Sequence, residues 1–208
     1  MKTELTVSLI TKSIAAELIG KHHYLSVNHG AGFMSGVNYG LFKGSALVGV
    51  CVFSSFGGRG VTRGAFGFSL GEGQYGMVEL TRLVLEPEFQ KAEHNAASWF
   101  VSRSIKLLRK EKPIRAILSY ADNDYHSGIV YAASNFRYYG LTDKKSDFHT
   151  ELPDGTFVKC KKKQWATRGE GKYIPRSQKH RFLMVFDKSL TVKWPEKKWV
   201  PREKIVVD

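Results

Sequence analysis

The chain has 208 residues, which is enough for one domain with a sizeable hydrophobic core and a short extension. Its 32 lysines and arginines against 19 aspartates and glutamates give a formal net charge of +13, which favours a polyanionic partner, most simply nucleic acid; a basic surface that binds nothing is the alternative. Two distant cysteines exclude a disulfide framework and a zinc site, and no apolar run approaches the roughly 20 residues that span a bilayer. We therefore expect a cytoplasmic protein that makes no contact with a membrane.

The first third of the chain predicts a strand, a helix and a strand pair. We expect a short strand at about 4–9, a helix that ends at Gly20, and two strands at 38–42 and 46–53 joined by a hairpin turn. His22 and His23 lie in a predicted loop between the helix and the strand pair, where either could transfer a proton or bind a metal. Adjacent histidines in a loop are also a common surface feature, and the sequence does not decide which of the two would act.

Residues 57–76 contain eight glycines, interspersed with arginines and aromatic residues. So many glycines disfavour a regular element. We expect a mobile loop beside a site, acting as a lid or as a flap that contacts DNA. A long, loosely packed hairpin is the alternative.

The middle of the chain predicts alternating strands and helices. Strands are expected at 77–85, 114–120 and 137–141, with a break at 86–89 and helices at about 95–110 and 127–135. This order is typical of an α/β protein. The segment 89–98 joins a strand to a helix N-terminus, where unpaired N–H groups and the helix dipole favour phosphate, and Asn95 or Ser98 is expected to cap the helix. A glycine-rich phosphate loop is absent from this segment of the sequence.

The last 58 residues are strongly basic. They hold 15 lysines and arginines against 7 acidic residues, which is +8 of the total charge. An apolar run at 181–186 predicts a final strand, and the rest is expected to be a basic tail. We therefore divide the chain into a core at 1–150 and a segment at 151–208 that completes the sheet and contacts DNA.

Within that segment, cations alternate with Trp165 and Tyr173, as expected of a surface that follows a phosphate backbone. Lysines that only solubilise a strand edge are the alternative. The expected DNA-binding residues are Lys161, Lys162, Lys163, Arg168, Lys172 and Arg176.

Polar residues end the predicted strand at 114–120. Ligands collect at the carboxyl ends of strands in open α/β sheets, so Ser119, Tyr120 and Asp122 are candidates for a site. Asp122 could accept a proton, and Tyr131, nine residues later, could donate one. Asp122 could instead cap the next helix or form an Asx-turn, and Tyr131 could be a core residue.

These residues carry a resemblance to a known family. The strand and helix order, with the strand at 79–85, resembles the GNAT superfamily of N-acetyltransferases, whose central strand and following helix hold coenzyme A. More specifically, the chain resembles the Mom DNA-modification proteins of Mu-like phages over about residues 20–186. Five short motifs carry this resemblance, at residues 23–24, 80–83, 95–100, 119–122 and 131–136.

The resemblance implies a GNAT-like α/β (α+β) fold, a mixed central sheet flanked by helices with a basic C-terminal extension. It also implies conversion of adenine in double-stranded DNA to an N6-carbamoylmethyl derivative, which shields phage DNA from restriction enzymes. Acetyl-CoA or a related acyl-CoA is the implied cofactor. The family pattern puts the acyl-CoA at Arg82, Leu83, Val84, Leu85, Asn95 and Ser98, and the target base among His23, Ser119, Asp122 and Tyr131.

The chain departs from the ordinary GNAT pattern at 90–94, which replaces the glycine-rich turn that binds phosphate. The resemblance also suggests iron, with His23 and Asp122 as possible ligands, although no spacing of two histidines and one carboxylate identifies a site. The oligomeric state stays open, with a dimer among the options. Two other functions remain: an acetyltransferase for a protein or small-molecule amine, and a DNA-binding protein without catalysis.

Overall fold

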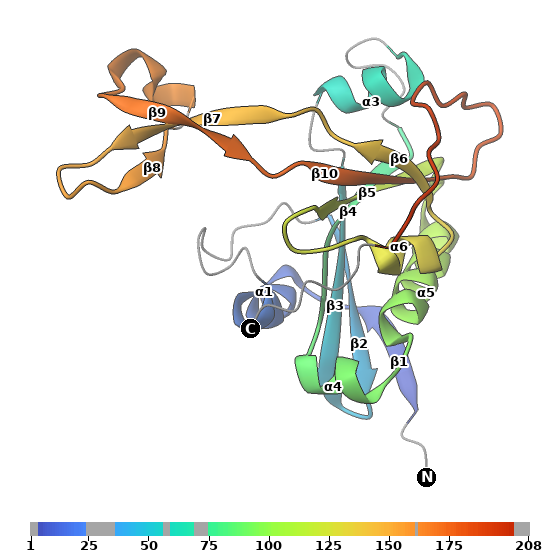
Figure 1. Cartoon of the computed structure of the whole chain (residues 1–208). Coiled ribbons are helices and arrows are strands. Elements are labelled where there is room, and N and C mark those ends of the chain that lie inside the picture. The colour runs from blue at the N-terminus through green and yellow to red at the C-terminus, as the bar shows by residue number, and fades with distance from the viewer. Residues whose placement is uncertain (1–3, 24–35, 56–58, 69–74, 161, 202–208) are drawn as a thin grey trace.

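The computed structural model describes residues 4–23, 36–55, 59–68, 75–160 and 162–201 (Figure 1). The chain forms a large sheet with helices on both faces and a second, smaller sheet that projects from it. In chain order the elements are β1 (Leu5–Leu9), α1 (Lys12–His22), β2 (Val37–Lys43), β3 (Ala46–Ser55), α3 (Arg59–Phe66), β4 (Met77–Leu85), α4 (Pro87–Ala92), α5 (Ala96–Glu111), β5 (Ala116–Asp122), α6 (Ile129–Ala133), β6 (Arg137–Leu141), β7 (Lys145–Glu151), β8 (Phe157–Lys159), η1 (Lys162–Thr167), β9 (Gly171–Arg176) and β10 (Lys179–Val185).

The large sheet is mixed and has seven strands in the order β1-β2-β3-β4-β5-β10-β6. Its neighbours pair antiparallel, except for β4 and β5, which pair in parallel. The expected mixed central sheet flanked by helices is therefore confirmed. Because β10 lies between β5 and β6, the C-terminal part of the chain completes the sheet.

The central strands are apolar because both of their faces are covered. Val50 and Val52 on β3 pack with Val84 on β4 against Leu18 and Ile19 of α1. The intervening residues of β3 point the other way and join the main core, where α5 packs through a row of residues at helical spacing: Ala97, Phe100, Val101, Ile105 and Leu108. Burial on both faces favours such a continuous apolar strand over an alternating one.

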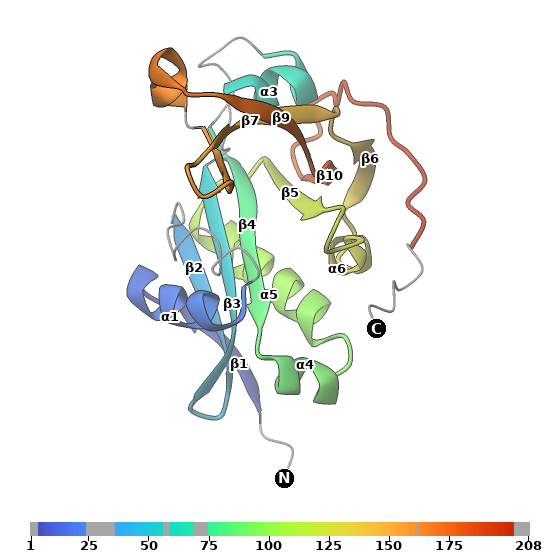
Figure 2. The ribbon, with the colours of Figure 1, turned by 60° about the vertical axis from the view of Figure 1, so that its left-hand side comes forward.

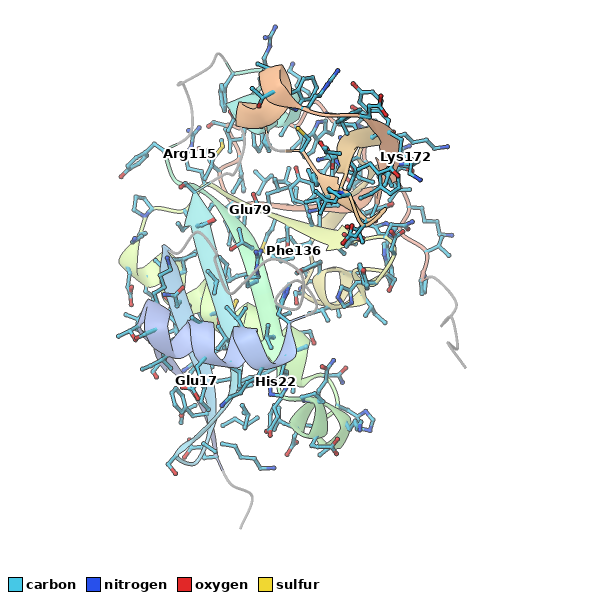
Figure 3. All side chains as sticks on the ribbon, turned by 90° about the vertical axis from the view of Figure 1, so that its left-hand side faces the viewer. Glu17, His22, Glu79, Arg115, Phe136 and Lys172 are labelled. Atoms are coloured by element: carbon cyan, nitrogen blue, oxygen red, sulfur yellow. The ribbon has the colours of Figure 1, made fainter. Side chains whose placement is uncertain are left out.

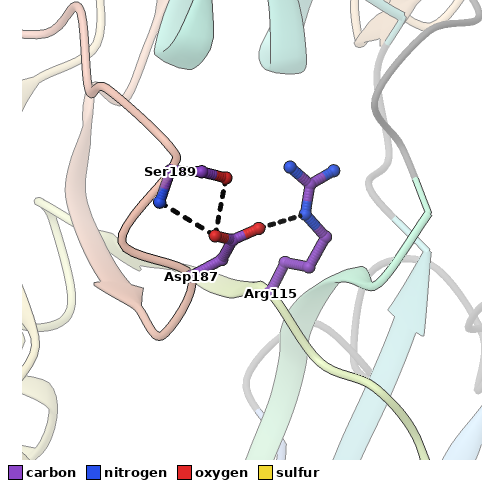
Figure 4. Close-up of polar contacts among 3 residues, drawn as sticks. All are labelled: Arg115, Asp187 and Ser189. Carbon is purple, nitrogen blue, oxygen red and sulfur yellow. Dashed lines mark hydrogen bonds and ion pairs between the residues drawn. The ribbon is translucent and has the colours of Figure 1, made fainter.

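A third cluster covers one face of β5 and β10, and the segment after β10 is tied to it. Asp187 accepts a hydrogen bond from Arg115 Nε at 2.7 Å, and from the backbone N–H and hydroxyl of Ser189 at 2.9 and 2.6 Å (Figure 4). The Ser189 hydroxyl and the Arg115 guanidinium lower the pKa of Asp187 to about 2. These bonds turn the chain back after β10, so that Leu190 packs beside Ala65 and Phe66 of α3.

The smaller sheet, in the order β8-β7-β9, forms an arm of residues 145–176, called the β-arm below. It continues the antiparallel pair of β6 and β10, since β7 follows β6 and β9 leads into β10. Thr142 bridges the two parts, its N–H donating to the Lys179 carbonyl at 2.9 Å and its hydroxyl accepting from the Lys179 N–H at 3.0 Å. The β-arm extends away from the core, on the side of the molecule where α1 lies (Figures 1 and 2).

Several predicted elements differ from the structure. Helix α1 continues past Gly20 to His22, because Leu18 and Ile19 are anchored in the core. The glycine-rich segment contains α3, whose Ala65 and Phe66 are buried, so the expectation of a loop is wrong for 59–66; residues 56–58 and 69–74 lie outside the described part. The expected break at 86–89 is the start of α4. No helix in the described ranges is long and apolar enough to span a membrane.

Candidate functional site

Strands β4 and β5 pair only from Met77 with Ala116 to Leu80 with Ser119. Beyond that point the two strands separate, and a cavity of about 390 Å³ lies where they part. Its walls come from β4, the end of β5, the loop at 125–128, the first residues of α6, and His23 at the end of α1. A site at the carboxyl ends of these two strands agrees with the expectation from the sequence.

Three of the four predicted catalytic residues line this cavity: His23, Asp122 and Tyr131. They come from the end of α1, the end of β5 and the middle of α6, so the fold brings His23 to two residues that lie far from it in the chain. His23, and not His22, is the histidine of the pair that lines the cavity. Tyr24 lies outside the described residues.

Ser119 has a different position from the one expected for a residue beside the target base. Its side chain is fully buried, and its hydroxyl donates a hydrogen bond of 2.9 Å to the carbonyl of Leu80. It does not line the cavity. Tyr120, the next residue along β5, lines the cavity, while the hydroxyl of Ser119 links β5 to β4.

His23 is uncharged near neutral pH. Burial, together with the positive charges of Arg82 and His126, lowers its pKa to about 4. The pKa of His126 is also lowered by burial, while the charge of Asp122 opposes that shift. A neutral imidazole can accept a hydrogen bond or a proton, so His23 is suited to face a donor group on a substrate.

Asp122 is held at the start of a tight loop. Its Oδ1 accepts hydrogen bonds from the Ser177 hydroxyl and from the N–H of Asp124, the latter at 3.1 Å. Its backbone carbonyl accepts from the N–H groups of Tyr125 and His126 at 3.1 and 2.7 Å. The Asx-turn considered from the sequence is therefore present, while the N-cap of α6 is Gly128. The turn does not remove Asp122 from the cavity, which its side chain lines.

Of the tyrosines that line the cavity, Tyr120 and Tyr131 are partly buried. The ring of Tyr131 packs on Phe136 and Phe182, with ring centroids 5.8 and 5.4 Å away, so it has both the core role and the site position that the sequence left open. Burial raises the pKa of Tyr120 to about 12, helped by the charge of Glu79 and opposed by that of Arg181. Tyr120 therefore stays protonated and can act as a hydrogen-bond donor.

The predicted cofactor residues divide into three groups. Arg82, Leu83 and Leu85 line the cavity. Val84 does not line the cavity and is buried against α1. Asn95 and Ser98 lie at the start of α5 and do not line the cavity; Asn95 is its N-cap residue with a left-handed backbone and makes no side-chain capping bond, and the Ser98 hydroxyl donates to the Asn95 carbonyl at 3.0 Å. Neither caps α5 in the way expected.

Several lining residues were missed by reasoning from the sequence. Glu79 lies in the middle of an apolar strand, and a carboxylate there is a signal that the sequence did contain. Seen from the side toward which the β-arm points, Glu79 lies between α1 below and the β-arm with Lys172 above (Figure 3). Gln90, His126 and Lys179 also line the cavity, and only the folded chain brings them there.

The cations on the three strands of the β-arm share one of its faces. The register places Lys145 opposite Arg176, and His149 between Lys159 and Lys172, so these side chains share a face. Four of them are exposed cations, and one of the acidic residues on that face, Asp147, is paired with Lys159 at 2.5 Å. The predicted DNA-binding residues Lys172 and Arg176 therefore belong to a row of positive charge.

The opposite face of the β-arm is aromatic. Phe148 and Tyr173 pack edge to face at 5.3 Å, and the Arg168 guanidinium lies over the rings of Phe148 and Trp165 at 4.5 and 5.0 Å. Arg168 is thus on the face away from the row of lysines. Lys162 and Lys163 belong to η1, and Lys161 lies outside the described residues.

The cavity has features that fit an extended ligand with amide groups. Beyond Leu80, none of the described strands pairs with the edge of β4 that faces β5, and such an edge can bond to the amides of a ligand as to another strand. The wall continues to Gln90 and to Ala97, near the N-terminus of α5. Within the ranges that the structure describes, no group of three or more His, Cys, Asp or Glu residues is arranged to hold a metal ion.

The sequence model of the Mom protein family matches residues 4–201. A comparison with curated protein sequences gave no match.

Solved structures of acetyltransferases share the fold at low sequence identity. An IAA acetyltransferase from Bacillus cereus has a TM-score of 0.53 at 12% identity, covering 88% of this chain and 100% of that chain. A putative acetyltransferase from Salmonella typhimurium, solved with its cofactor acetyl-CoA, has a TM-score of 0.51 at 12% identity, covering 89% and 95%. An acetyltransferase from Bacillus subtilis in complex with CoA has a TM-score of 0.50 at 15% identity, covering 88% and 99%.

Proposed function

Because the chain belongs to the Mom protein family and has the fold of the acetyltransferases compared above, we propose that it is a transferase that uses acetyl-CoA or a related acyl-CoA to modify DNA. Its substrate is adenine in duplex DNA, and its product is N6-carbamoylmethyladenine, which protects phage DNA from restriction. The proposal rests mainly on the cavity between β4 and β5. One part of this cavity runs along the open edge of β4, and the other is lined by polar side chains that include His23 and Asp122.

The acyl-CoA fits the part of the cavity along β4. Its extended amide-bearing arm would bond to the backbone edge beyond Leu80, between Arg82 and Leu85, and its phosphates would lie toward α5. Helix α5 is 16 residues long, and the dipole at its N-terminus favours an anion there. When bound, acetyl-CoA would supply the two-carbon unit; joining its methyl carbon to N6 requires a two-electron oxidant that takes up the two hydrogens removed, and an ammonia donor would displace CoA to form the terminal amide. The helix α4 stands where ordinary GNAT enzymes have a glycine-rich turn, so we expect the phosphates to be held differently.

The polar end of the cavity suits adenine N6. The lone pair of this nitrogen is delocalised into the ring, so the amine must lose a proton as it forms a new bond. Two side chains at the cavity wall offer an acceptor for that proton, since the imidazole of His23 is neutral and the carboxyl group of Asp122 accepts hydrogen bonds. One of the two takes the N6 proton, and the protonated phenol of Tyr120 is placed to donate a hydrogen bond to the base.

The β-arm provides the surface for the DNA backbone. Like charges directly opposite one another destabilise a sheet, yet Lys145 lies opposite Arg176. Lys159 and Lys172 lie on the same face, on either side of His149. A phosphate backbone laid across these cations would offset their repulsion. The β-arm and Glu79 of the cavity wall are both visible from the same side of the molecule (Figure 3). One duplex on that side can therefore contact both the β-arm and the cavity.

The rival enzymatic function is acetylation of a protein or small-molecule amine. A lysate of expressing cells, supplied with acetyl-CoA labelled in its acyl carbons, tests both functions at once. We expect label in duplex DNA that survives protease digestion and disappears on digestion by nuclease. Label only in protein or small amines would support the rival. A DNA-binding protein without catalysis would give no labelled product although it binds DNA.

A further inference from the structure

The loop at 122–128, between β5 and α6, presents two large side chains at the rim of the cavity. Tyr125 is 61% exposed and Ile129, at the first position of α6, is 58% exposed, and both also line the cavity. Isolated exposed apolar residues are ordinary. Here two of them lie at the mouth of the proposed active site, where water would otherwise cover them.

The loop at 122–128, which carries Tyr125 and leads into Ile129, is held by hydrogen bonds. Asp122 anchors the loop from within, through its bonds to the N–H groups of the next turn. The base of the β-arm holds it from outside, because the Ser177 hydroxyl bonds to Asp122 and the Gln178 carbonyl accepts from the Asn123 N–H at 3.0 Å.

The far end of the loop is held equally firmly. Trp199 Nε1 donates to the Ser127 carbonyl at 2.9 Å. Gly128 has a left-handed backbone with φ 78°, and a Cβ at this position would collide with the buried ring of Phe182, so only glycine fits there. A loop fixed at both ends can push a side chain against a resisting partner without yielding.

From this geometry we infer that Tyr125 and Ile129 form a wedge that enters the base stack of duplex DNA and fills the space left by the target adenine when it turns into the cavity. The inference rests on the proposed function, since it takes duplex DNA as the partner. Bases on one strand are stacked about 3.4 Å apart, which is close to the thickness of an aromatic ring. Enzymes that act on a base inside a duplex must extrude it, and apolar side chains are the groups that occupy an opened base step.

The test uses duplexes that each carry fluorescent 2-aminopurine at one adenine position, so that fluorescence rises where a base leaves the stack. The wild-type protein should raise the fluorescence at one or more positions. Tyr125→Ala should reduce that rise by about tenfold or more, and Tyr125→Phe should keep it, since the ring and not the hydroxyl does the stacking. Ile129→Ala should give an intermediate loss. Tyr75→Ala is the control, because Tyr75 is 74% exposed but does not line the cavity.

A second measurement separates a wedge from a residue that only contacts the base. The target adenine is placed opposite an abasic site, where little stacking and pairing has to be broken. Tyr125→Ala should then regain fluorescence when 2-aminopurine takes the target position, and modification when adenine does, each to within about twofold of wild type. An equal loss on paired and abasic DNA, or no loss on either, would overturn the wedge.

The outcomes also distinguish this inference from the proposed function. If base extrusion depends on Tyr125 but no modified adenine is found, the wedge is supported and the proposed function is contradicted. If modified adenine is found but fluorescence rises neither with wild type nor with the variants, the wedge is contradicted and the proposed function is supported. If saturating wild-type protein neither extrudes nor modifies any base, both are wrong.

Discussion

Ser119 Oγ donates a hydrogen bond of 2.9 Å to the backbone carbonyl of Leu80, at the last position where β4 and β5 pair. Both residues are buried, and the cavity opens directly beyond them. The bond therefore marks the vertex of the split between the two strands. It fixes where the open edge of β4 begins, on which the proposed acyl-CoA site depends.

Ser119→Ala tests this assignment. Removing the hydroxyl leaves a buried carbonyl without that bond, so we expect the free energy of unfolding to fall by about 1 kcal/mol. Since Ser119 does not line the cavity, the level of DNA modification should stay within about twofold of wild type when equal amounts of folded protein are compared. Denaturant titration and nucleoside analysis measure the two effects. If a stable Ser119→Ala variant lost DNA modification, Ser119 would have to contact the substrate.

Arg82→Gln tests the electrostatics at His23. Burial is the main cause of the low pKa of His23, and the charge of Arg82 is the next. Removing that charge should move the pKa of His23 from about 4 upward toward the usual 6.5, observed by NMR titration of the imidazole. Lys179→Gln is the matched control, because Lys179 lines the same cavity but is not among the causes of the shift. An unchanged His23 pKa in Arg82→Gln would show that the two groups do not interact.

The low pKa of His23 also predicts how stability depends on pH. Its pKa is about 4 in the folded chain and 6.5 in the unfolded chain, so the unfolded state binds the proton first as the pH falls. The contribution of neutral His23 is therefore present above pH 6.5 and is lost as the pH falls through that value toward about 4. His23→Gln should flatten this part of the stability curve, measured by denaturation at a series of pH values. Parallel curves for variant and wild type would contradict the low pKa.

Asp122→Asn separates a chemical role from a structural one. The amide keeps the size of the side chain but is a much poorer proton acceptor, so modification should fall by about a hundredfold or more if Asp122 takes the N6 proton. Ser177→Ala is the control: it removes one hydrogen bond to Asp122 and leaves the carboxylate. It should reduce modification only a few-fold. Equal effects of the two variants would mean that Asp122 serves the loop and that His23 is the base.

The double variant Lys172→Ala, Arg176→Ala tests the β-arm. Each cation that no longer neutralises a phosphate should weaken duplex binding and reduce the slope of log affinity against log salt by about 0.9. The expected reduction for both is thus close to twice that value, measured by fluorescence anisotropy at several salt concentrations. Lys91→Ala is the control, because Lys91 is exposed on α4 and ion-paired with Glu88. An equal reduction in this control would mean that the β-arm has no special role.

Elements with strong periodicity could be predicted from the sequence. Strand β4 was predicted with its observed bounds, and α5 to within one residue at each end, because each buries a regular apolar pattern. The β-arm was missed because β7 and β9 bury almost nothing and are held by pairing with each other. Helix α3 was missed because packing of Ala65 and Phe66 outweighs the glycines around them.

Within the site, the sequence predicted which segments converge better than which side chains face the cavity. His23, Asp122 and Tyr131 line it, but Ser119 and Val84 do not. The Ser119 hydroxyl is bonded to the Leu80 carbonyl and Val84 packs against α1, and only the folded chain defines these two contacts. His126 and Lys179 could not have been predicted, since only the fold brings the loop after β5 and the start of β10 to the cavity.

The central claim is that the chain modifies adenine in DNA, and one mass spectrum tests it most directly. Plasmid DNA from cells that express the protein is digested to nucleosides and compared with DNA from cells that express Asp122→Asn. The account predicts a deoxyadenosine adduct heavier by a carbamoylmethyl group in place of one hydrogen, abundant with wild type and scarce with the variant. Only unmodified deoxyadenosine, from cells that contain soluble wild-type protein, would contradict it.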